Sequence, residues 1–193
     1  MSNKVKWAFL CSSWGRNAKD VIDWHVKNNQ IDKIGLVIYE SIPCGAANSA
    51  KKNNIKQKLI DPRFFKNRDQ YQQAVLSLLI DENITHLFLL GYKWLIKPPI
   101  LNAFPDRIIN IHPSLFPSFL GTKTAIQDAL EYGVKISGIT THIIDNRFDR
   151  GTIICQEPIR IDEEDTFETL YDKFSKKGLP IILETMKMVE NSN

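Results

Sequence analysis

An amide and an imidazole stand two residues apart in the segment Asn110-Ile111-His112-Pro113. The apolar residues 108–111 predict a buried strand, and side chains at i and i+2 of a strand point to the same face. In open α/β sheets, ligands bind outside the carboxyl ends of the strands, where this pair falls. The pair suits proton transfer and stabilisation of an oxyanion. The alternative is a strand that ends in a polar loop, with His112 capping backbone groups.

A second segment, from Thr140 to Gly151, reads as a strand that runs into a loop with two carboxylates, Asp145 and Asp149. Such a loop could carry a carboxylate to a catalytic histidine and stabilise its protonated form. Asp, Asn and Gly also favour turns, so a solvated hairpin loop is the alternative. His142 lies inside the predicted strand and is expected to be a core histidine.

The turn Ser12-Ser13-Trp14-Gly15-Arg16-Asn17 lies between a predicted strand and a predicted helix. A helix N-terminus after a strand is a ready site for an anion, and an arginine can add a charge-assisted bond to phosphate. The turn holds one glycine, however, so an ordinary helix capped by Asn17 is the alternative. The candidate substrate-binding residues are Ser13, Gly15, Arg16, Asn17 and Pro113.

Strands and helices alternate along the chain that must position these residues. The predicted strands are 5–10, 34–39, 58–60, 85–90, 108–111, 136–144 and 152–158. The predicted helices are 17–28, 49–54, 69–82, 124–132, 165–174 and 179–189, and the run Asp165-Thr166-Phe167-Glu168 resembles a capping box. Near-continuous apolar strands between amphipathic helices indicate an α/β fold. We expect a doubly wound, mostly parallel sheet with helices on both faces.

Composition places the chain among ordinary globular proteins. It has 193 residues, of which 43% are hydrophobic and 24% charged, and a formal net charge of +3. No apolar run approaches the roughly 20 residues of a membrane span, and the first ten residues do not resemble a signal peptide. No basic stripe suggests nucleic acid as a partner. The expectation is a soluble, cytoplasmic protein with neither a membrane nor a nucleic-acid partner.

The three cysteines and four histidines suggest neither a disulfide framework nor a metal site. Cys11 and Cys155 lie in apolar runs and are expected to be core thiols, which fits a reducing compartment. No two cysteines form a C-x-x-C pair, and the histidines have no ligand spacing. We therefore expect no metal.

A series of linked motifs from Asn110 to Asp165 resembles the folate-dependent formyltransferases, most closely those that act on a ribonucleotide amine. The motifs are NIHPSLFPSF at 110–119, Gly121, ALEYGVKISGITTHIID at 129–145, FDRGTIICQEPI at 148–159, and Asp165-Thr166. The N-terminal half fits the family in length and order. The resemblance therefore covers most of the chain.

The resemblance implies transfer of a formyl group from 10-formyltetrahydrofolate, as co-substrate, to a primary amine. It implies that Asn110, His112 and Asp149 are the catalytic residues. It also implies that Tyr92 to Leu95 and Ile143 to Asp149 line the folate pocket. The candidate folate-binding residues are Tyr92, Lys93, Trp94, Leu95, Ile143, Ile144 and Asp145. We expect one formyltransferase domain over 1–193, with a nucleotide- or phosphate-binding lobe at 1–100 and a catalytic and folate lobe at 101–193.

Two departures from the family leave the acceptor open. The ribonucleotide enzymes carry two glycines in the phosphate loop, where this chain has Gly15 alone, and their usual Met-Arg pair reads Lys93-Trp94 here. The leading acceptor is glycinamide ribonucleotide of purine synthesis, supported by the short chain and by the HPSLFPSF motif. The alternative is a nucleotide-linked amino sugar, and a different class of function is a non-catalytic folate- or nucleotide-binding protein. In each case the partner is a small molecule, and for an enzyme it is a phosphorylated amine; the protein is expected to be a monomer or homodimer.

Overall fold

The computed structural model describes residues 4–144 and 151–192, and the chain divides into two compact units. The first unit ends at Asn110 and the second covers Ile111–Ser192. The division falls inside a strand, later in the chain than the lobe boundary expected near residue 100. Asp145 and Asp149 lie outside the described residues.

Seven strands form one sheet in the order β3-β2-β1-β4-β5-β6-β7. The strands are β1 Trp7–Cys11, β2 Ile34–Tyr39, β3 Lys56–Leu59, β4 His86–Leu89, β5 Ile108–His112, β6 Ile136–Ile143 and β7 Ile153–Arg160. Neighbouring strands from β3 to β5 are parallel, whereas β6 and β7 are antiparallel. The mostly parallel α/β sheet expected from the sequence is confirmed.

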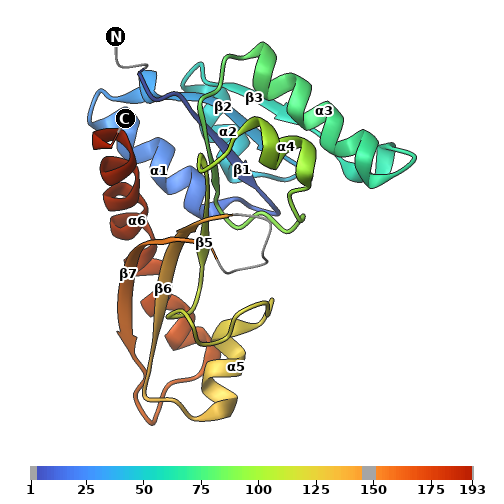
Figure 1. The fold of residues 1–193 in the computed structure, drawn as a ribbon. Coiled ribbons are helices and arrows are strands. Elements are labelled where there is room, and N and C mark those ends of the chain that lie inside the picture. The colour runs from blue at the N-terminus through green and yellow to red at the C-terminus, as the bar shows by residue number, and fades with distance from the viewer. Residues whose placement is uncertain (1–3, 145–150, 193) are drawn as a thin grey trace. The chain divides into compact units, whose positions relative to one another are not determined.

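The helices of the first unit pack in two pairs. They are α1 Arg16–Lys27, α2 Gly45–Lys52, α3 Arg68–Asp81 and α4 Pro98–Ala103, with short 3-10 turns at Ile31–Lys33 and Pro62–Phe64. From β1 the chain passes through α1 to β2 and through α2 to β3, moving toward one edge of the sheet. It then returns through α3 to β4, which lies beside β1, and continues through α4 to β5 (Figure 1). Because such crossovers are right-handed, the two pairs cover opposite faces, and α1 packs on α2 as α3 does on α4. The order reverses between β1 and β4, which is the switch point of the sheet.

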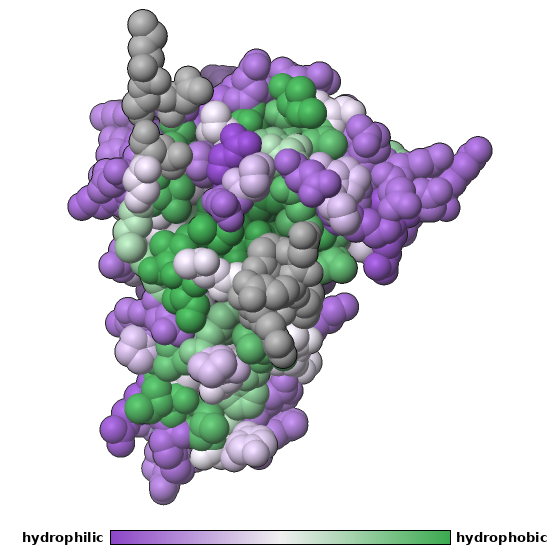
Figure 2. Space-filling model, in the orientation of Figure 1, coloured by the Kyte–Doolittle hydropathy of each residue, from purple (hydrophilic) through white to green (hydrophobic). Residues whose placement is uncertain are grey.

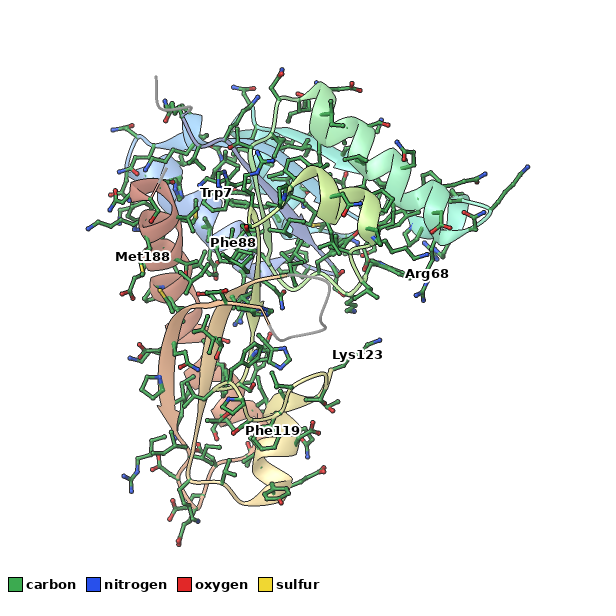
Figure 3. All side chains as sticks on the ribbon, in the orientation of Figure 1. Trp7, Arg68, Phe88, Phe119, Lys123 and Met188 are labelled. Atoms are coloured by element: carbon green, nitrogen blue, oxygen red, sulfur yellow. The ribbon has the colours of Figure 1, made fainter. Side chains whose placement is uncertain are left out.

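The core of the first unit follows from strands that are apolar along their whole length. Every residue of β1 and β4 is buried, as expected for parallel strands covered on both faces. Trp7 of β1 and Phe88 of β4 lie with ring centroids 5.9 Å apart (Figure 3). The surface over α3, by contrast, is largely hydrophilic (Figure 2).

Helix α4 lies where the sequence analysis predicted no helix, and it begins with Pro98-Pro99. Proline is tolerated in the first turn of a helix, where its missing N–H would have no partner anyway. The prolines occupy this first turn, and Ile100 is then fully buried. The two prolines therefore begin a helix that follows directly on the candidate folate segment.

The second unit contains α5 Ala125–Tyr132 and α6 Phe167–Asn191. The expectation of two helices at 165–174 and 179–189 was wrong, because α6 is continuous through Gly178 and Pro180. Its buried side chains keep one helical phase across this point. They are Leu170, Phe174, Ile181, Ile182, Thr185 and Met186, with Gly178 between them. Burial of this stripe outweighs the local cost of an internal proline, about 3 kcal/mol.

The capping box at the start of α6 is confirmed, one residue later than the run suggested. Thr166 is the N-cap, and its side chain accepts from the N–H of Thr169 while the Thr169 hydroxyl accepts from the N–H of Thr166. Asp165 instead accepts hydrogen bonds from the N–H of Asp162 and from the Thr169 hydroxyl. It also pairs with Lys173.

Candidate active site

Asn110 and His112 both lie at the carboxyl end of β5, on the same face of the strand because they are two residues apart. Asn110 pairs with Leu89 of β4, so it lies beside the end of that strand. His112 is 7% exposed, and its Nε2 lies 3.0 Å from the carbonyl oxygen of Phe119. A carbonyl oxygen only accepts, so Nε2 carries a proton. The imidazole is therefore oriented by the loop that follows its own strand.

The loop after β5 is held against β6 and β7 by hydrogen bonds. The hydroxyl of Thr140 donates to the carbonyl of Ser114 at 2.7 Å and accepts from the N–H of Phe116 at 3.1 Å. The amide of Gln156 donates to the carbonyl of Phe116 at 3.1 Å. These bonds fix the backbone of Phe116, whose ring centroid lies 5.3 Å from that of His112. Pro113, the first residue of this loop, is half-buried.

His142 is a buried strand residue, as expected. Its Nδ1 lies 3.2 Å from the carbonyl oxygen of Ile143, and its ring centroid lies 4.8 Å from that of Phe116. Ile143, the last residue of β6, and Ile144 are half-buried. The remaining candidates on this side, Asp145 and Asp149, are outside the described residues.

The loop from Ser12 to Asn17 follows β1 and leads into α1. Gly15, not Asn17, is the N-cap of α1, so the alternative of an Asn17 cap was wrong, and no side chain caps this helix. Gly15 has φ 66°, and a Cβ there would meet Cys11 Sγ at 2.9 Å and the Ala46 Cβ at 3.0 Å. Both the left-handed backbone and the lack of space require glycine.

The segment after β4 contacts this loop directly. The backbone N–H of Lys93 donates to Ser12 Oγ at 2.9 Å, and Lys93 Nζ donates to Ser13 Oγ at 2.8 Å. The contact arises because β1 and β4 are adjacent parallel strands, with Leu10 paired to Leu89. The structure therefore brings two groups of sequence-predicted residues together at the switch point, where ligands of open α/β sheets bind.

Three side chains that the sequence did not reveal hold the segment Tyr92 to Leu95. The Tyr71 hydroxyl is hydrogen-bonded to that of Tyr92, and the Trp94 indole N–H donates to the Glu40 carboxylate. Gln72, which is 2% exposed, donates to the carbonyl of Leu95 at 3.3 Å and accepts from the N–H of Lys97 at 3.0 Å.

These contacts also affect the two phenols. Burial raises the pKa of Tyr71 to about 12, and burial with the neighbouring Tyr71 raises the pKa of Tyr92. Both hydroxyls therefore stay protonated at neutral pH. No sequence signal marked Tyr71, Gln72 or Glu40, because helical spacing presents the first two as ordinary members of the buried face of α3.

A pair of buried thiols lies beneath the Ser12–Asn17 loop. Cys11 ends β1, and Cys44 is the N-cap residue of α2. Their mutual hydrogen bond lowers the pKa of Cys44 to about 6, helped by the backbone N–H groups of Ala47 and Ala46, while the same bond and burial raise the pKa of Cys11. Cys11 is thus a core thiol, as expected.

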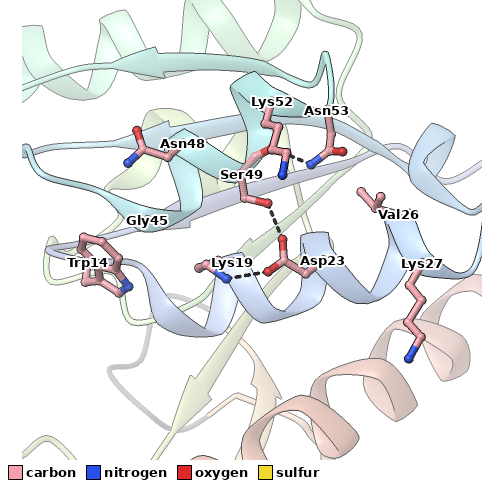
Figure 4. Close-up of a pocket in the computed structure, with 10 residues that line it drawn as sticks. All are labelled: Trp14, Lys19, Asp23, Val26, Lys27, Gly45, Asn48, Ser49, Lys52 and Asn53. Atoms are coloured by element: carbon pink, nitrogen blue, oxygen red, sulfur yellow. Dashed lines mark hydrogen bonds and ion pairs between the residues drawn. The ribbon is translucent and has the colours of Figure 1, made fainter.

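A groove of about 520 Å³ lies between α1 and α2 (Figure 4). It is lined by Trp14, Lys19, Asp23, Val26, Lys27, Gly45, Asn48, Ser49, Lys52 and Asn53. Asp23 accepts hydrogen bonds from Lys19, at 2.6 Å, and from Ser49. Partial burial raises the pKa of Asp23, but these bonds outweigh it, and the net pKa is lowered. The carboxylate thus links the two helices.

Residues 4–144 and 151–192 are the ranges that the structure describes. Within them, no three His, Cys, Asp or Glu side chains are grouped so that they could hold a metal ion. Within the same ranges, no helix has the length and apolar character needed to cross a bilayer.

The fold and the β5 pair define a class of α/β enzymes with a polar site at the carboxyl edge of a doubly wound sheet. The family model described as formyl transferase matches residues 5–186, and the chain belongs to this family. The resemblance noted in the sequence is confirmed, and with it the expectation of a folate-dependent formyltransferase.

Several known proteins are similar to the chain. It is 31% identical to phosphoribosylglycinamide formyltransferase of Bacillus subtilis over 189 residues, which is 96% of each chain. It is 31% identical to the human trifunctional purine biosynthetic protein adenosine-3 over 88% of this chain and 17% of that protein.

Solved structures agree with this. Glycinamide ribonucleotide transformylase 1 of Symbiobacterium toebii superposes with a TM-score of 0.92 at 29% identity, covering 100% of this chain and 90% of that one. Phosphoribosylglycinamide formyltransferase of Bacillus halodurans gives a TM-score of 0.89 at 33% identity, covering 97% of each chain.

Proposed function

We propose that this protein transfers the formyl group of 10-formyltetrahydrofolate to the primary amine of glycinamide ribonucleotide, a reaction of purine biosynthesis. The observation that carries the proposal is the Asn110–His112 pair at the carboxyl end of β5, in a chain 31% identical over 96% of its length to a phosphoribosylglycinamide formyltransferase. The acceptor is then a small phosphorylated amine.

In the proposed reaction, the amine nitrogen attacks the formyl carbon and negative charge develops on the formyl oxygen. The Asn110 amide and protonated His112 donate to this oxyanion, and each preorganised donor of this kind is worth about 3–4 kcal/mol. The imidazolium has two N–H donors, one of which bonds to the carbonyl of Phe119 in the structure. Asp149 stabilises the imidazolium or accepts the amine proton through water. Tetrahydrofolate leaves with a proton on its nitrogen.

The proposed folate-binding residues are Tyr92, Trp94 and Leu95, together with Ile143, Ile144 and Asp145. A flat pteridine ring needs apolar walls and a few backbone hydrogen bonds. The side-chain hydrogen bonds that hold Tyr92, Trp94 and Leu95 support this assignment, because they fix the positions of these residues.

The proposed anchor for the acceptor phosphate is the loop of Ser13, Gly15, Arg16 and Asn17, with Pro113 contacting the acceptor beside His112. The first-turn N–H groups of α1 have no side-chain cap, so they suit an anion. We propose that the two units act as one formyltransferase domain, in which the first supplies this anchor.

A substrate comparison tests the proposal. Purified protein is supplied with 10-formyltetrahydrofolate and either glycinamide ribonucleotide or a nucleotide-linked amino sugar, and the formylated product is identified by mass spectrometry. Efficient formylation of the ribonucleotide is expected, with His112→Ala as the inactive control.

The amino sugar is the second candidate, favoured by the single glycine of the loop. Formylation of the amino sugar alone would replace the acceptor and leave the reaction class standing. No transfer to any amine would favour a non-catalytic binding protein.

A further inference from the structure

Lys93 lies in the candidate folate segment, yet both of its nitrogens are directed to the other candidate site. Its backbone N–H donates to Ser12 Oγ at 2.9 Å, and its Nζ donates to Ser13 Oγ at 2.8 Å. The first bond fixes the backbone of Lys93 beside the loop, and the second brings the ammonium over it. Its immediate neighbours in sequence face elsewhere, since Tyr92 bonds to Tyr71 and Trp94 to Glu40.

The charge of Lys93 is not neutralised within the part of the chain that the structure describes. Among residues 4–144 and 151–192, its hydrogen-bond partner at Nζ is a neutral hydroxyl, and no carboxylate forms an ion pair with it. By contrast, Lys97, two residues beyond this segment, forms an ion pair with Asp69 at 2.5 Å. An ammonium has three N–H donors, of which Ser13 uses one, so Lys93 retains donors for an anion.

The loop beneath this ammonium is itself suited to an anion but has limited backbone reach. The N-terminus of α1 contributes uncapped N–H groups and the positive end of the helix dipole. Gly15 is the one glycine of the loop, so only there can the backbone approach a phosphate without a Cβ in the way. A cation supplied from outside the loop compensates for the contacts that a second glycine would allow.

We propose that Lys93 is a specificity-determining residue for the acceptor: its ammonium contacts the anionic group held by the Ser12–Asn17 loop, and it does not serve the folate. This inference rests on the proposed function for the identity of the acceptor. Lys93 thus belongs to the binding site of the phosphorylated substrate. Recognition of that substrate by the loop after β1 then depends on a side chain that follows the neighbouring strand, β4.

Steady-state kinetics with Lys93→Met provides the first test. This variant removes the charge and keeps the backbone N–H bonded to Ser12. The KM for glycinamide ribonucleotide should rise about 10-fold or more, because a charge-assisted hydrogen bond is lost, while kcat and the folate KM change less than about 2-fold. Lys93→Arg should restore most of the affinity. Lys97→Met is the matched control, since its charge is already paired, and should leave the acceptor KM unchanged.

A binding measurement separates this inference from the proposed function. Ribose 5-phosphate is titrated calorimetrically into wild type, Lys93→Met and Lys97→Met, with ribose as the uncharged comparison. Weaker binding of ribose 5-phosphate to Lys93→Met alone supports the inference even if the wild type does not formylate glycinamide ribonucleotide. Equal binding by Lys93→Met and wild type would overturn it. A rise in the folate KM in place of the acceptor KM would also overturn it and return Lys93 to the folate pocket.

Discussion

The imidazole of His112 is oriented before any substrate arrives. Its Nε2 donates to the carbonyl of Phe119 at 3.0 Å, and its ring lies against that of Phe116. Phe116 is in turn held by Thr140 and Gln156. A donor that needs no reorganisation is most effective at a developing oxyanion, so this small network contributes to the proposed chemistry without touching the substrate.

Replacing His112 by alanine should lower kcat at least about 100-fold, since a preorganised donor worth several kcal/mol is removed. Asp149→Asn should have a similar effect. Steady-state formyl transfer measures both, and circular dichroism with thermal unfolding should show little loss of fold. Full activity in either variant would remove that residue from the catalytic group.

Gly15→Ala should destabilise the protein by about 1–3 kcal/mol and raise the acceptor KM. An alanine Cβ would meet Cys11 Sγ at 2.9 Å in a backbone conformation of φ 66°. Urea unfolding gives the free energy of unfolding. Gly91→Ala is the control, because Gly91 also has positive φ but a Cβ there meets nothing within 4 Å. If the two variants lose equal stability, the close approach of Gly15 to Cys11 has no energetic consequence.

At the scale of elements, α3 acts as a support for the strand end that carries the candidate folate segment. Tyr71 and Gln72 are adjacent on this helix, and they bond to Tyr92, Leu95 and Lys97. The side-chain amide of Gln72 is buried, and both its N–H and its carbonyl group have hydrogen-bond partners in this loop. The amide therefore fixes the loop while the loop itself stays accessible to solvent. Helix α3 therefore supports the candidate folate segment without contributing a candidate folate-binding residue.

Gln72→Leu should raise the folate KM several-fold and lower the free energy of unfolding by about 1 kcal/mol, because the carbonyl of Leu95 and the N–H of Lys97 lose their hydrogen-bond partner. Kinetics and urea unfolding measure these effects. Gln73→Leu on the exposed side of the same helix is the matched control. If the folate KM is unchanged in Gln72→Leu, this amide has no positioning role.

The start of α6 should make a pH-dependent contribution to stability. A hydrogen bond from Lys173 and the N–H of Asp162 lower the pKa of Asp165 below its ordinary value of 3.8. A lowered carboxyl pKa gives stability that is present above the unfolded pKa and lost as pH falls through the folded pKa. Asp165→Asn should therefore be less stable than wild type at pH 7, and the difference should shrink below about pH 4.

Thermal unfolding across pH measures that difference, with Glu164→Gln as an exposed control. A difference between Asp165→Asn and wild type that stays constant down to acid pH would mean that the charge of Asp165 is not involved.

At the scale of the whole molecule, the proposed folate contacts come from residues distant in sequence. Adding a folate analogue should slow hydrogen exchange in Tyr92 to Leu95 and in Ile143 to Asp149, because a bound ligand shields the backbone amides that it contacts. Mass spectrometry of peptic fragments measures this, with residues 68–81 of α3 as the internal reference. Protection confined to β2 and β3 at the far edge of the sheet would contradict the proposed site.

Much of the fold could be predicted because buried parallel strands are apolar along their whole length. The range of β2 matches the prediction, and β1, β4 and β5 differ from theirs by a few residues at the ends. The predictions failed where local chemistry was outweighed by burial. Two helices were predicted where α6 runs continuously through Pro180, and no helix was predicted where Pro98-Pro99 begins α4.

The sequence by itself determined the alternation of strands and helices, the Asn110–His112 pair and the family, because these depend on residue type and spacing along one strand. Only the tertiary structure decided which distant residues meet. The order of the sheet sets β1 beside β4, and this neighbourhood brings Lys93 to Ser12 and Ser13. Contacts between strand ends about 80 residues apart leave no periodic pattern in the sequence. They follow from the direction in which the helical crossovers connect the strands, which sets the strand order of the sheet.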